Sequence, residues 1–340
     1  MSALAPLAIT LGDPAGIGPE IIAKAFRDAP DAMQGCFVAG ELGCMRRGTG
    51  FAAAQGIPLP VAEIAAPGEV AHVPPRCIPL LPVVRCDGAL PPIGQVSAQA
   101  GRIAGDCVTW AARAALRGEI AGLVTAPLHK EALSAAGVSF PGHTELLQSE
   151  AAAHLGVSVA LLPVRMMLAN DELRTVLVSI HVSLRDAIDA VTRDNVLQTL
   201  RIAHTSLAAL LARAPRIAVA GLNPHAGEGG LFGREELEVI VPAMAQARAE
   251  GIDAHGPFAP DTVFMRARRG EFDAVVAMYH DQGLIPVKYM GVEQGVNVTL
   301  GLPLVRTSPD HGTAFDIAGS GKADASSLVA AVRMARRLAA

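Results

Sequence analysis

The chain has 340 residues, of which 51% are hydrophobic but only 4% aromatic, and its formal net charge is −4. This length suggests two domains, and a core built mostly from Ala, Val, Leu and Ile suits helices packed on a parallel sheet. Charges of both signs are interspersed without a basic run, which excludes a nucleic-acid partner. No window of about 18 uncharged apolar residues would span a bilayer and no signal segment opens the chain, so we expect a cytoplasmic protein without a membrane partner.

The cysteines are five in number, never lie in CxxC spacing and all fall in the first third of the chain: Cys36, Cys44, Cys77, Cys86 and Cys107. An odd set with this spacing indicates neither a disulfide framework nor a zinc knuckle. We expect reduced thiols in the core or at the surface.

The first segment predicts a strand, a glycine turn and a helix. Residues 7–11 are apolar, the turn covers residues 12–20, and the helix continues to about Arg27. This order is typical of the start of an α/β domain. The turn does not fit the G-x-G-x-x-G dinucleotide motif, and it is either an anion site at a helix amino terminus or a tight structural turn.

Short strands and helices continue the alternation. The expected strands are 36–39, 77–83 and 122–125, with a connecting region at 48–75 and a helix at 97–116. His129 and Lys130 follow the strand 122–125, and they either reach a ligand or are ordinary surface groups.

Residues 140–145 predict a turn followed by a helix, with Thr144 placed to cap that helix. His143 and Thr144 offer an imidazole and a hydroxyl at the helix amino terminus, where an anion is stabilised. The pair therefore predicts either an anion site or capping alone.

The following part of the chain alternates in the same way, which indicates parallel βαβ units. The expected strands are 165–169, 174–180, 216–220 and 273–278. One expected helix begins near Arg185, and two others cover 192–213 and 234–249.

Three of these strands each deliver one histidine to their carboxyl end: His181, His225 and His280. If the strands are parallel in one sheet, the imidazoles emerge at the same edge, where ligands bind in open α/β sheets. Three neutral imidazoles with an open position are typical of a catalytic metal site. The glycines of residues 221–230 would leave room beside His225 for a ligand. The alternative for each histidine is a side chain hydrogen-bonded in a turn.

Polar side chains further along the chain are candidates for substrate binding. Lys288 stands in mostly apolar company and is a candidate base or phosphate partner, or else a surface lysine with a buried stem. Arg306 offers a planar fork for a phosphate or carboxylate, and Asn297 offers an amide. Asp310 and His311 either cap a helix that starts there or line a cofactor groove.

These motifs, in this order, resemble those of the PdxA family, the 4-hydroxythreonine-4-phosphate dehydrogenases of vitamin B6 synthesis. The matching segments are 12–20, 142–145, 221–230, 278–283, 301–303 and 310–313. The resemblance implies a two-domain α/β fold like that of the isocitrate and isopropylmalate dehydrogenases, with mostly parallel sheets and the active site in the interdomain cleft. We expect residues 1–140 and 300–340 to form the first domain, and residues 141–299 to form the second, which carries the histidines. The family also implies a homodimer with its active site near the subunit interface.

The resemblance further implies a role for each candidate. The implied metal ligands are His181, His225 and His280, and the implied substrate contacts are His143, Thr144, Lys288, Asn297 and Arg306. Asp261 matches an acidic position of the active-site region and joins Lys288 as a catalytic candidate. No residue is assigned to the cofactor.

The implied reaction is metal-assisted oxidation of an alcohol. A divalent ion, zinc, magnesium or cobalt, would lower the pKa of the substrate hydroxyl, and Lys288 or a bound water would take the proton. Hydride would pass to NAD or NADP. The β-keto acid formed from 4-hydroxy-L-threonine 4-phosphate would then lose carbon dioxide and give 3-amino-2-oxopropyl phosphate, a step of pyridoxal phosphate biosynthesis.

One segment departs from the family pattern. Residues 179–185 stand where threonines before the histidine and a proline after it are expected. Paralogues oxidise threonate or erythronate 4-phosphate or, more distantly, aromatic cis-dihydrodiols, but the retained phosphate contacts favour a small phosphorylated substrate. The competing classes are a metal-dependent hydrolase or lyase on the same histidines and a non-catalytic phosphate-binding protein.

Overall fold

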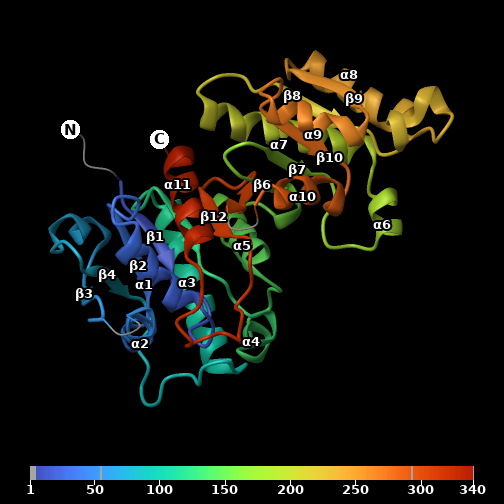
Figure 1. Cartoon of the computed structure of the whole chain (residues 1–340). Coiled ribbons are helices and arrows are strands. Elements are labelled where there is room, and N and C mark those ends of the chain that lie inside the picture. Colours follow the sequence, from blue (N-terminus) through green and yellow to red (C-terminus); the bar gives the residue numbers. More distant parts are fainter. Residues whose placement is uncertain (1–4, 54–55, 292–293, 340) are drawn as a thin grey trace. The chain divides into compact units, whose positions relative to one another are not determined.

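The computed structural model describes residues 5–53, 56–291 and 294–339. The chain forms two compact units (Figure 1): unit 1 comprises Met1–Leu162 and Leu302–Ala340, and unit 2 comprises Pro163–Gly301. The first segment of unit 1 extends to residue 162 instead of the expected 140. The reason is that helix α5 (His143–Leu155) packs against helix α3 (Ala98–Leu116) of unit 1.

Unit 1 is built on parallel strands in the order β3-β4-β2-β1-β5-β12. The strands are β1 (Leu7–Thr10), β2 (Cys36–Gly40), β3 (Val61–Glu63), β4 (Ile78–Pro82), β5 (Gly122–Thr125) and β12 (Arg306–Pro309). Every residue of β1, β2 and β5 is buried, because helices cover both faces of a parallel sheet.

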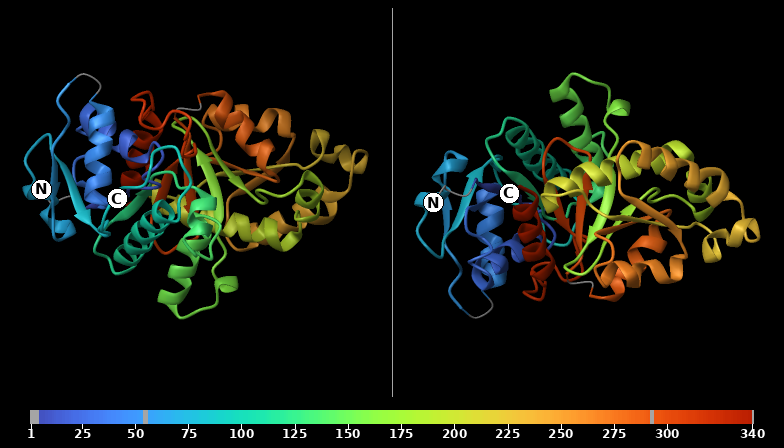
Figure 2. Two further views of the ribbon diagram at one scale, coloured as in Figure 1. Left: turned by 90° about the horizontal axis from the view of Figure 1, so that it is seen from below. Right: turned by 90° about the horizontal axis from the view of Figure 1, so that it is seen from above.

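The remaining helices of unit 1 are α1 (Gly18–Asp28), α2 (Leu42–Ala52), α4 (Lys130–Ala135) and α11 (Ser326–Ala339), with short 3₁₀ turns η1 (Pro67–His72) and η2 (Val159–Leu161). Helices α1 and α11 come from opposite ends of the chain and pack side by side (Figures 1 and 2). A hydrophobic cluster that includes Phe37, Val108 and Leu123 fills the space between the sheet and α3.

Two expectations for unit 1 were wrong. The supposed connecting region 48–75 contains the end of α2 and the strand β3, whose sequences are too rich in Gly and Ala to show a clear period. The helix expected from Asp310 does not form: residues 310–325 adopt turns, and the helix begins at Ser326. Ala314 has a φ of +42°, which a right-handed helix does not allow.

Unit 2 has a mixed sheet in the order β11-β6-β7-β10-β8-β9. Strands β11 (Val296–Leu300), β6 (Arg165–Ala169) and β7 (Arg174–Leu177) pair antiparallel, whereas β7, β10 (Ala274–Ala277), β8 (Ile217–Ala220) and β9 (Ala254–Phe258) pair parallel. The core cluster includes Leu177, Val275 and Leu284.

The helices of unit 2 are α6 (Leu184–Asp189), α7 (Arg193–Leu211), α8 (Val241–Ala249), α9 (Pro260–Arg268) and α10 (His280–Tyr289), with a kinked turn η3 (Pro224–Gly230) and a π-helical turn η4 (Glu236–Ile240). The helix expected at 234–249 is thus η4 followed by α8. None of the helices within the described ranges has the length and apolar character needed to cross a bilayer.

Candidate active site

The three histidines follow three neighbouring parallel strands of unit 2. Strand β10 lies between β7 and β8 and is parallel to both, with Val275 opposite Thr175 on one side and Ala218 on the other. His181, His280 and His225 come a few residues after these strands end, so all three emerge at the same sheet edge. The expectation of parallel strands that share this edge is confirmed.

Side-chain hydrogen bonds tie the three strand ends to one another. Ser179 Oγ donates to the carbonyl oxygen of Met278 (3.0 Å), which joins the ends of β7 and β10. Gln282 Oε1 accepts from Met278 N (2.7 Å), and its Nε2 donates to the carbonyl oxygen of Gly221 (2.8 Å), which joins the ends of β10 and β8. Gln282 is only 9% exposed. The histidine-bearing loops therefore start from a fixed frame.

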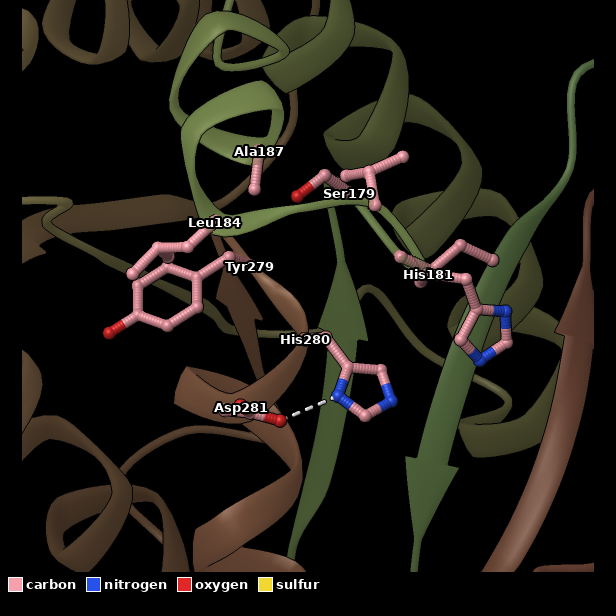
Figure 3. A pocket seen from close by; sticks show the side chains of 9 residues that line it. Ser179, His181, Leu184, Ala187, Tyr279, His280 and Asp281 are labelled. Carbon is pink, nitrogen blue, oxygen red and sulfur yellow. Dashed lines mark hydrogen bonds and ion pairs between the residues drawn. The ribbon is translucent and has the colours of Figure 1, made fainter.

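His181 and His280 share one pocket. Their ring centroids lie 5.5 Å apart, with the ring planes inclined by 46°. The pocket has a volume of about 220 Å³ and is also lined by Leu184 and Tyr279 (Figure 3). Figure 3 shows the His280 ring between His181 on one side and Asp281 on the other.

Asp281 orients the imidazole of His280. Its Oδ1 lies 2.7 Å from Nδ1 of His280, the dashed contact in Figure 3. A carboxylate there accepts a hydrogen bond from Nδ1–H, so the neutral ring presents the lone pair of Nε2 to a ligand. A carboxylate behind a histidine is the usual support for a metal ligand.

His225 lies on a left-handed turn. The φ angles of His225, Ala226, Gly227, Glu228 and Gly229 are all positive, between +43° and +80°. His181 also has a positive φ of +45°. Each non-glycine residue in this region costs about 1–2 kcal/mol, and such backbone is concentrated at functional sites.

Glu236 holds this turn in place. The carboxylate is 2% exposed, and its Oε1 accepts from the backbone N of Leu222 and of Asn223, both at 2.7 Å. Its Oε2 accepts from Asn223 Nδ2 at 2.9 Å. A Cβ on Gly227 would come within 2.6 Å of the same Oε2. Gly227 therefore makes room for Glu236, and not for a ligand as expected from the sequence.

The structure does not bring the three imidazoles into one ligand cluster. His225 is exposed, does not line the pocket of His181 and His280, and instead has its ring 6.2 Å from that of Phe232. Among the described residues, ligand atoms of Glu41, Cys44 and Cys86 lie within 4.8 Å of one another, but those of the three histidines do not. The role of His225 as a third ligand stays a prediction.

The donor set at the unit 2 edge fits a divalent ion. Two imidazoles face one pocket, and one of them has its second nitrogen held by a carboxylate. Imidazole nitrogen suits zinc and other first-row metals better than magnesium, which prefers oxygen.

The other predicted residues of unit 2 lie on separate elements. Lys288 is half-buried in the last turn of α10, the helix that begins at His280. Asn297 lies on β11 opposite Leu168 of β6. Asp261 is exposed in the first turn of α9, a helix that packs against the His225 turn.

In unit 1, Arg306 and His143 form a second constellation. Arg306 is 4% exposed at the start of β12, and its Nε and Nη2 donate to Thr125 Oγ1 at the end of β5 (3.2 and 2.8 Å). His143 begins α5, and Thr144 follows it. The cap residue of α5 is Gly142, without a side-chain cap bond, so the expectation that Thr144 caps this helix was wrong.

Burial dominates the electrostatics of this constellation. Burial lowers the pKa of Arg306 to about 10, and the Glu145 carboxylate offsets part of that effect. Burial and, second, the Arg306 charge lower the pKa of His143 well below its usual range, although a hydrogen bond with Ala126 opposes this. The pair at neutral pH is thus a guanidinium cation beside a neutral imidazole, whose buried Nε2 has no hydrogen-bond partner. A buried cation suits an anionic ligand.

The glycine turn that follows β1 in unit 1 contains buried polar groups. Gly12 has a φ of +71° and comes so close to the carbonyl of Pro127 that a Cβ would lie 2.4 Å from its oxygen. Asp13 is fully buried and accepts from Ala15 N (2.8 Å), and burial raises its pKa. His129 stacks on Phe315 with centroids 4.9 Å apart. The turn is thus a close-packed junction of β1 and β5.

Sequence reasoning missed several residues that position the site: Asp281, Gln282, Ser179 and Glu236. Asp281 had a signal, since an acidic residue directly after a histidine can support its ring. Gln282 and Glu236 had none, because the bonds that join separate elements are not local: Gln282 reaches Gly221, 61 residues away, and Glu236 reaches Leu222 and Asn223, 14 and 13 residues away.

Known proteins resemble this chain over nearly its whole length. Residues 33–335 match the family model described as "Pyridoxal phosphate biosynthetic protein PdxA". The chain is 54% identical to the 4-hydroxythreonine-4-phosphate dehydrogenase of Beijerinckia indica, over 98% of this chain and 95% of that protein. It is 45% identical to the D-threonate 4-phosphate dehydrogenase of Salmonella typhimurium, over 98% of each.

A solved structure agrees. The crystal structure of the 4-hydroxythreonine-4-phosphate dehydrogenase of Klebsiella pneumoniae is 40% identical, with a TM-score of 0.86 over 99% of this chain and 100% of that one. The chain is therefore an α/β enzyme of the dehydrogenase class. It belongs to the PdxA family of pyridoxal phosphate biosynthetic proteins, as its motifs predicted.

Proposed function

We propose that this enzyme oxidises 4-hydroxy-L-threonine 4-phosphate with NAD or NADP as hydride acceptor. The product is the 3-keto acid, which loses carbon dioxide to give 3-amino-2-oxopropyl phosphate. The 54% identity to a relative named for this substrate, against 45% to one named for D-threonate 4-phosphate, supports the choice.

The buried guanidinium of Arg306 beside His143 is the observation that carries the proposal. A buried arginine binds a phosphate through two parallel charge-assisted hydrogen bonds. An uncharged substrate would leave the buried charge without a counter-ion. His143 and Thr144 lie at the amino terminus of α5, where the Thr144 hydroxyl is a donor and the helix dipole favours negative charge. We assign the phosphate of the substrate to these three residues.

His181, His225 and His280 would hold one divalent metal ion, of which zinc or cobalt suits imidazole better than magnesium does. When bound, such an ion supplies Lewis acidity to the hydroxyl oxygen of the substrate. Asp281 keeps a proton on Nδ1 of His280 and thereby leaves Nε2 free of one.

The remaining roles concern proton transfer and substrate orientation. Lys288 is the candidate base that takes the hydroxyl proton while hydride leaves the same carbon for the nicotinamide. Asp261 is the second candidate for proton transfer, and Asn297 is the candidate partner of a polar group of the substrate. We further propose that the enzyme works as a homodimer with its active site near the subunit interface, which light scattering on the purified protein tests.

The test is a side-by-side assay of nicotinamide reduction. Purified enzyme is given 4-hydroxy-L-threonine 4-phosphate, D-threonate 4-phosphate, erythronate 4-phosphate and a cis-dihydrodiol, each with NAD and with NADP. We expect the highest kcat/KM for the first substrate and formation of 3-amino-2-oxopropyl phosphate. No reduction with any of the phosphorylated substrates would refute the proposal.

The second candidate is D-threonate 4-phosphate, because relatives at 45% identity carry that name. The two substrates share the phosphate and differ at carbon 2, where one has an amino group and the other a hydroxyl. A higher kcat/KM for the hydroxy acid would select this alternative. Turnover that continues after removal of nicotinamide would instead indicate a metal-dependent hydrolase or lyase.

A further inference from the structure

Two cysteines and a glutamate of unit 1 lie close together in space. All three are far from the metal-ligand histidine candidates in the sequence. The carboxylate of Glu41 and the sulfurs of Cys44 and Cys86 all lie within 4.8 Å of one another. Glu41 is the cap residue of α2, Cys44 lies in the first turn of that helix, and Cys86 lies in the segment after β4. This set was not predicted from the sequence, because its spacing matches no metal motif.

The surroundings of the three groups suit a cation. Cys44 is fully buried and Glu41 is 7% exposed, whereas Cys86 is only partly buried and leaves a way in from solvent. Burial and, second, the Glu41 carboxylate raise the pKa of the Cys86 thiol, and a hydrogen bond from Gln99 Nε2 to Cys86 Sγ (3.8 Å) opposes this. Burial, and then the Glu41 carboxylate, raise the pKa of the Cys44 thiol, so a thiolate there needs a positive partner.

We propose that Glu41, Cys44 and Cys86 bind a zinc ion at a site separate from the histidine edge. Zinc accepts two thiolates and one carboxylate, and Zn–S bonds of about 2.3 Å place neighbouring ligand atoms roughly 3.5–4 Å apart, within the observed spread. Binding displaces the two thiol protons to solvent, and water completes the coordination. A disulfide is the competing use of two adjacent sulfurs, and the Glu41 carboxylate, which caps α2 by accepting from Cys44 N (2.6 Å), keeps that bond in either case.

The site would fasten the segment after β4 to the glycine turn. Arg47, on the same helix as Cys44, donates to the carbonyl oxygens of Pro91 (2.7 Å) and of Pro14 (3.0 Å). Gly94 N donates to the carbonyl oxygen of Ala15 at 2.8 Å. A metal that links Cys86 to α2 therefore stabilises the segment that packs on residues 12–16. This is a structural role, in which the free energy of metal binding adds to the stability of the folded chain.

Cobalt spectroscopy tests the proposal. Reduced, metal-free, full-length protein is titrated with Co²⁺, because only a thiolate ligand gives a sulfur-to-cobalt charge-transfer band in the near ultraviolet. We expect a band that saturates at a single ion per chain and disappears when Zn²⁺ is added. Cys86→Ser should abolish the band, and Cys77→Ser, a partly buried cysteine outside the set, should keep it.

The histidine site provides an internal control. The variant His280→Ala should keep the thiolate band, so failure of the proposed function and failure of this site are separable. Thermal unfolding of Cys86→Ser without metal, compared with the wild type, establishes that the variant folds. Absence of the band in the wild type, its persistence in Cys86→Ser, or a Cys44–Cys86 disulfide found by mass spectrometry of protein purified without reductant would each overturn the proposal.

Discussion

The strand ends of unit 2 and those of unit 1 hold their functional groups in opposite ways. In unit 2, His181 and His225 are exposed on backbone with positive φ. In unit 1, Arg306 is buried on a regular strand. The first arrangement stores backbone strain and presents imidazole rings, whereas the second stores the desolvation cost of a cation. A metal ion suits the imidazole nitrogens of unit 2, and an anion suits the buried guanidinium of unit 1.

The stabilising contacts differ accordingly. The unit 2 loops depend on hydrogen bonds at the strand ends, where Glu236 accepts from the backbone N of Leu222 and Gln282 donates to the carbonyl oxygen of Gly221. Arg306 depends on Thr125 of the neighbouring strand and on the packing around it. We therefore expect changes at the anchors to affect unit 2 through loop order and changes at Arg306 to affect ligand affinity alone.

The largest effect is expected for His280→Ala. Loss of one of the proposed ligands should abolish stoichiometric metal binding and lower kcat/KM by about a thousandfold or more, since the Lewis acid is lost. Metal content by elemental analysis and nicotinamide reduction measure this. Asp281→Asn is the matched variant, because it changes the carboxylate that supports His280 and leaves the histidine in place. It should weaken metal binding only about 10–100-fold. Full metal content and activity in His280→Ala would remove this histidine from the site.

Arg306→Lys is expected to be the next largest. Lysine keeps the charge but loses the fork, and charge-assisted hydrogen bonds contribute about 1.5–3 kcal/mol, so KM should rise roughly 10–100-fold with little change in metal content. Steady-state kinetics with the phosphorylated substrate measure this. Arg113→Lys, an exposed ion-paired arginine of the same unit, should leave KM unchanged. An unaltered KM in Arg306→Lys would contradict phosphate binding there.

Glu236→Gln should act through the His225 turn. The amide keeps an oxygen for the backbone N of Leu222 and of Asn223 but sets an N–H group against Asn223 Nδ2, which costs about 1–3 kcal/mol of stability. We expect faster amide exchange over residues 222–236 and weaker metal binding, with secondary structure retained. Glu238→Gln, an exposed neighbour, is the control. Equal exchange in both variants would show that Glu236 does not order the turn.

The smallest effect concerns pH and His143. Its folded-state pKa lies well below the usual value near 6.5, so acidification protonates this residue in the unfolded chain first. Its contribution to stability is therefore complete above about pH 6.5 and falls as the pH drops below that value, by at most ~1.4 kcal/mol per pH unit. Urea unfolding between pH 7 and pH 5 should show a shallower loss of stability for His143→Asn than for the wild type. Parallel curves would contradict the lowered pKa.

Much of the fold was predictable from local pattern. Apolar runs predicted β1, β5 and β6 within a residue, and Ser97 marked the start of α3, where its side chain accepts from Ala100 N. Such runs are readable because a strand covered on both faces is continuously apolar. The predictions were wrong where the sequence lacks a clear pattern. The elements α2 and β3 lie in a stretch rich in Gly, Ala and Pro, and the turns after Asp310 lack a helical period.

The candidate site was predictable only in part. A histidine just after an apolar run is visible in the sequence, and so is a motif that matches a family. The anchors Glu236 and Gln282 were not visible, since an isolated glutamate or glutamine in a helix has the same local pattern whether it is exposed or buried. The roles of Lys288, Asn297 and Asp261 in the reaction remain predictions.

The sequence by itself determined the α/β class, the strands that carry His181, His225 and His280, and the family, because period, apolar runs and motif order are local properties of the chain. Tertiary structure alone decided that β10 lies between β7 and β8, that Arg306 is buried beside His143, and that Cys86 meets Glu41 and Cys44. These contacts join residues far apart in sequence. They arise from strand pairing and packing of the whole unit, and no short stretch of sequence records them.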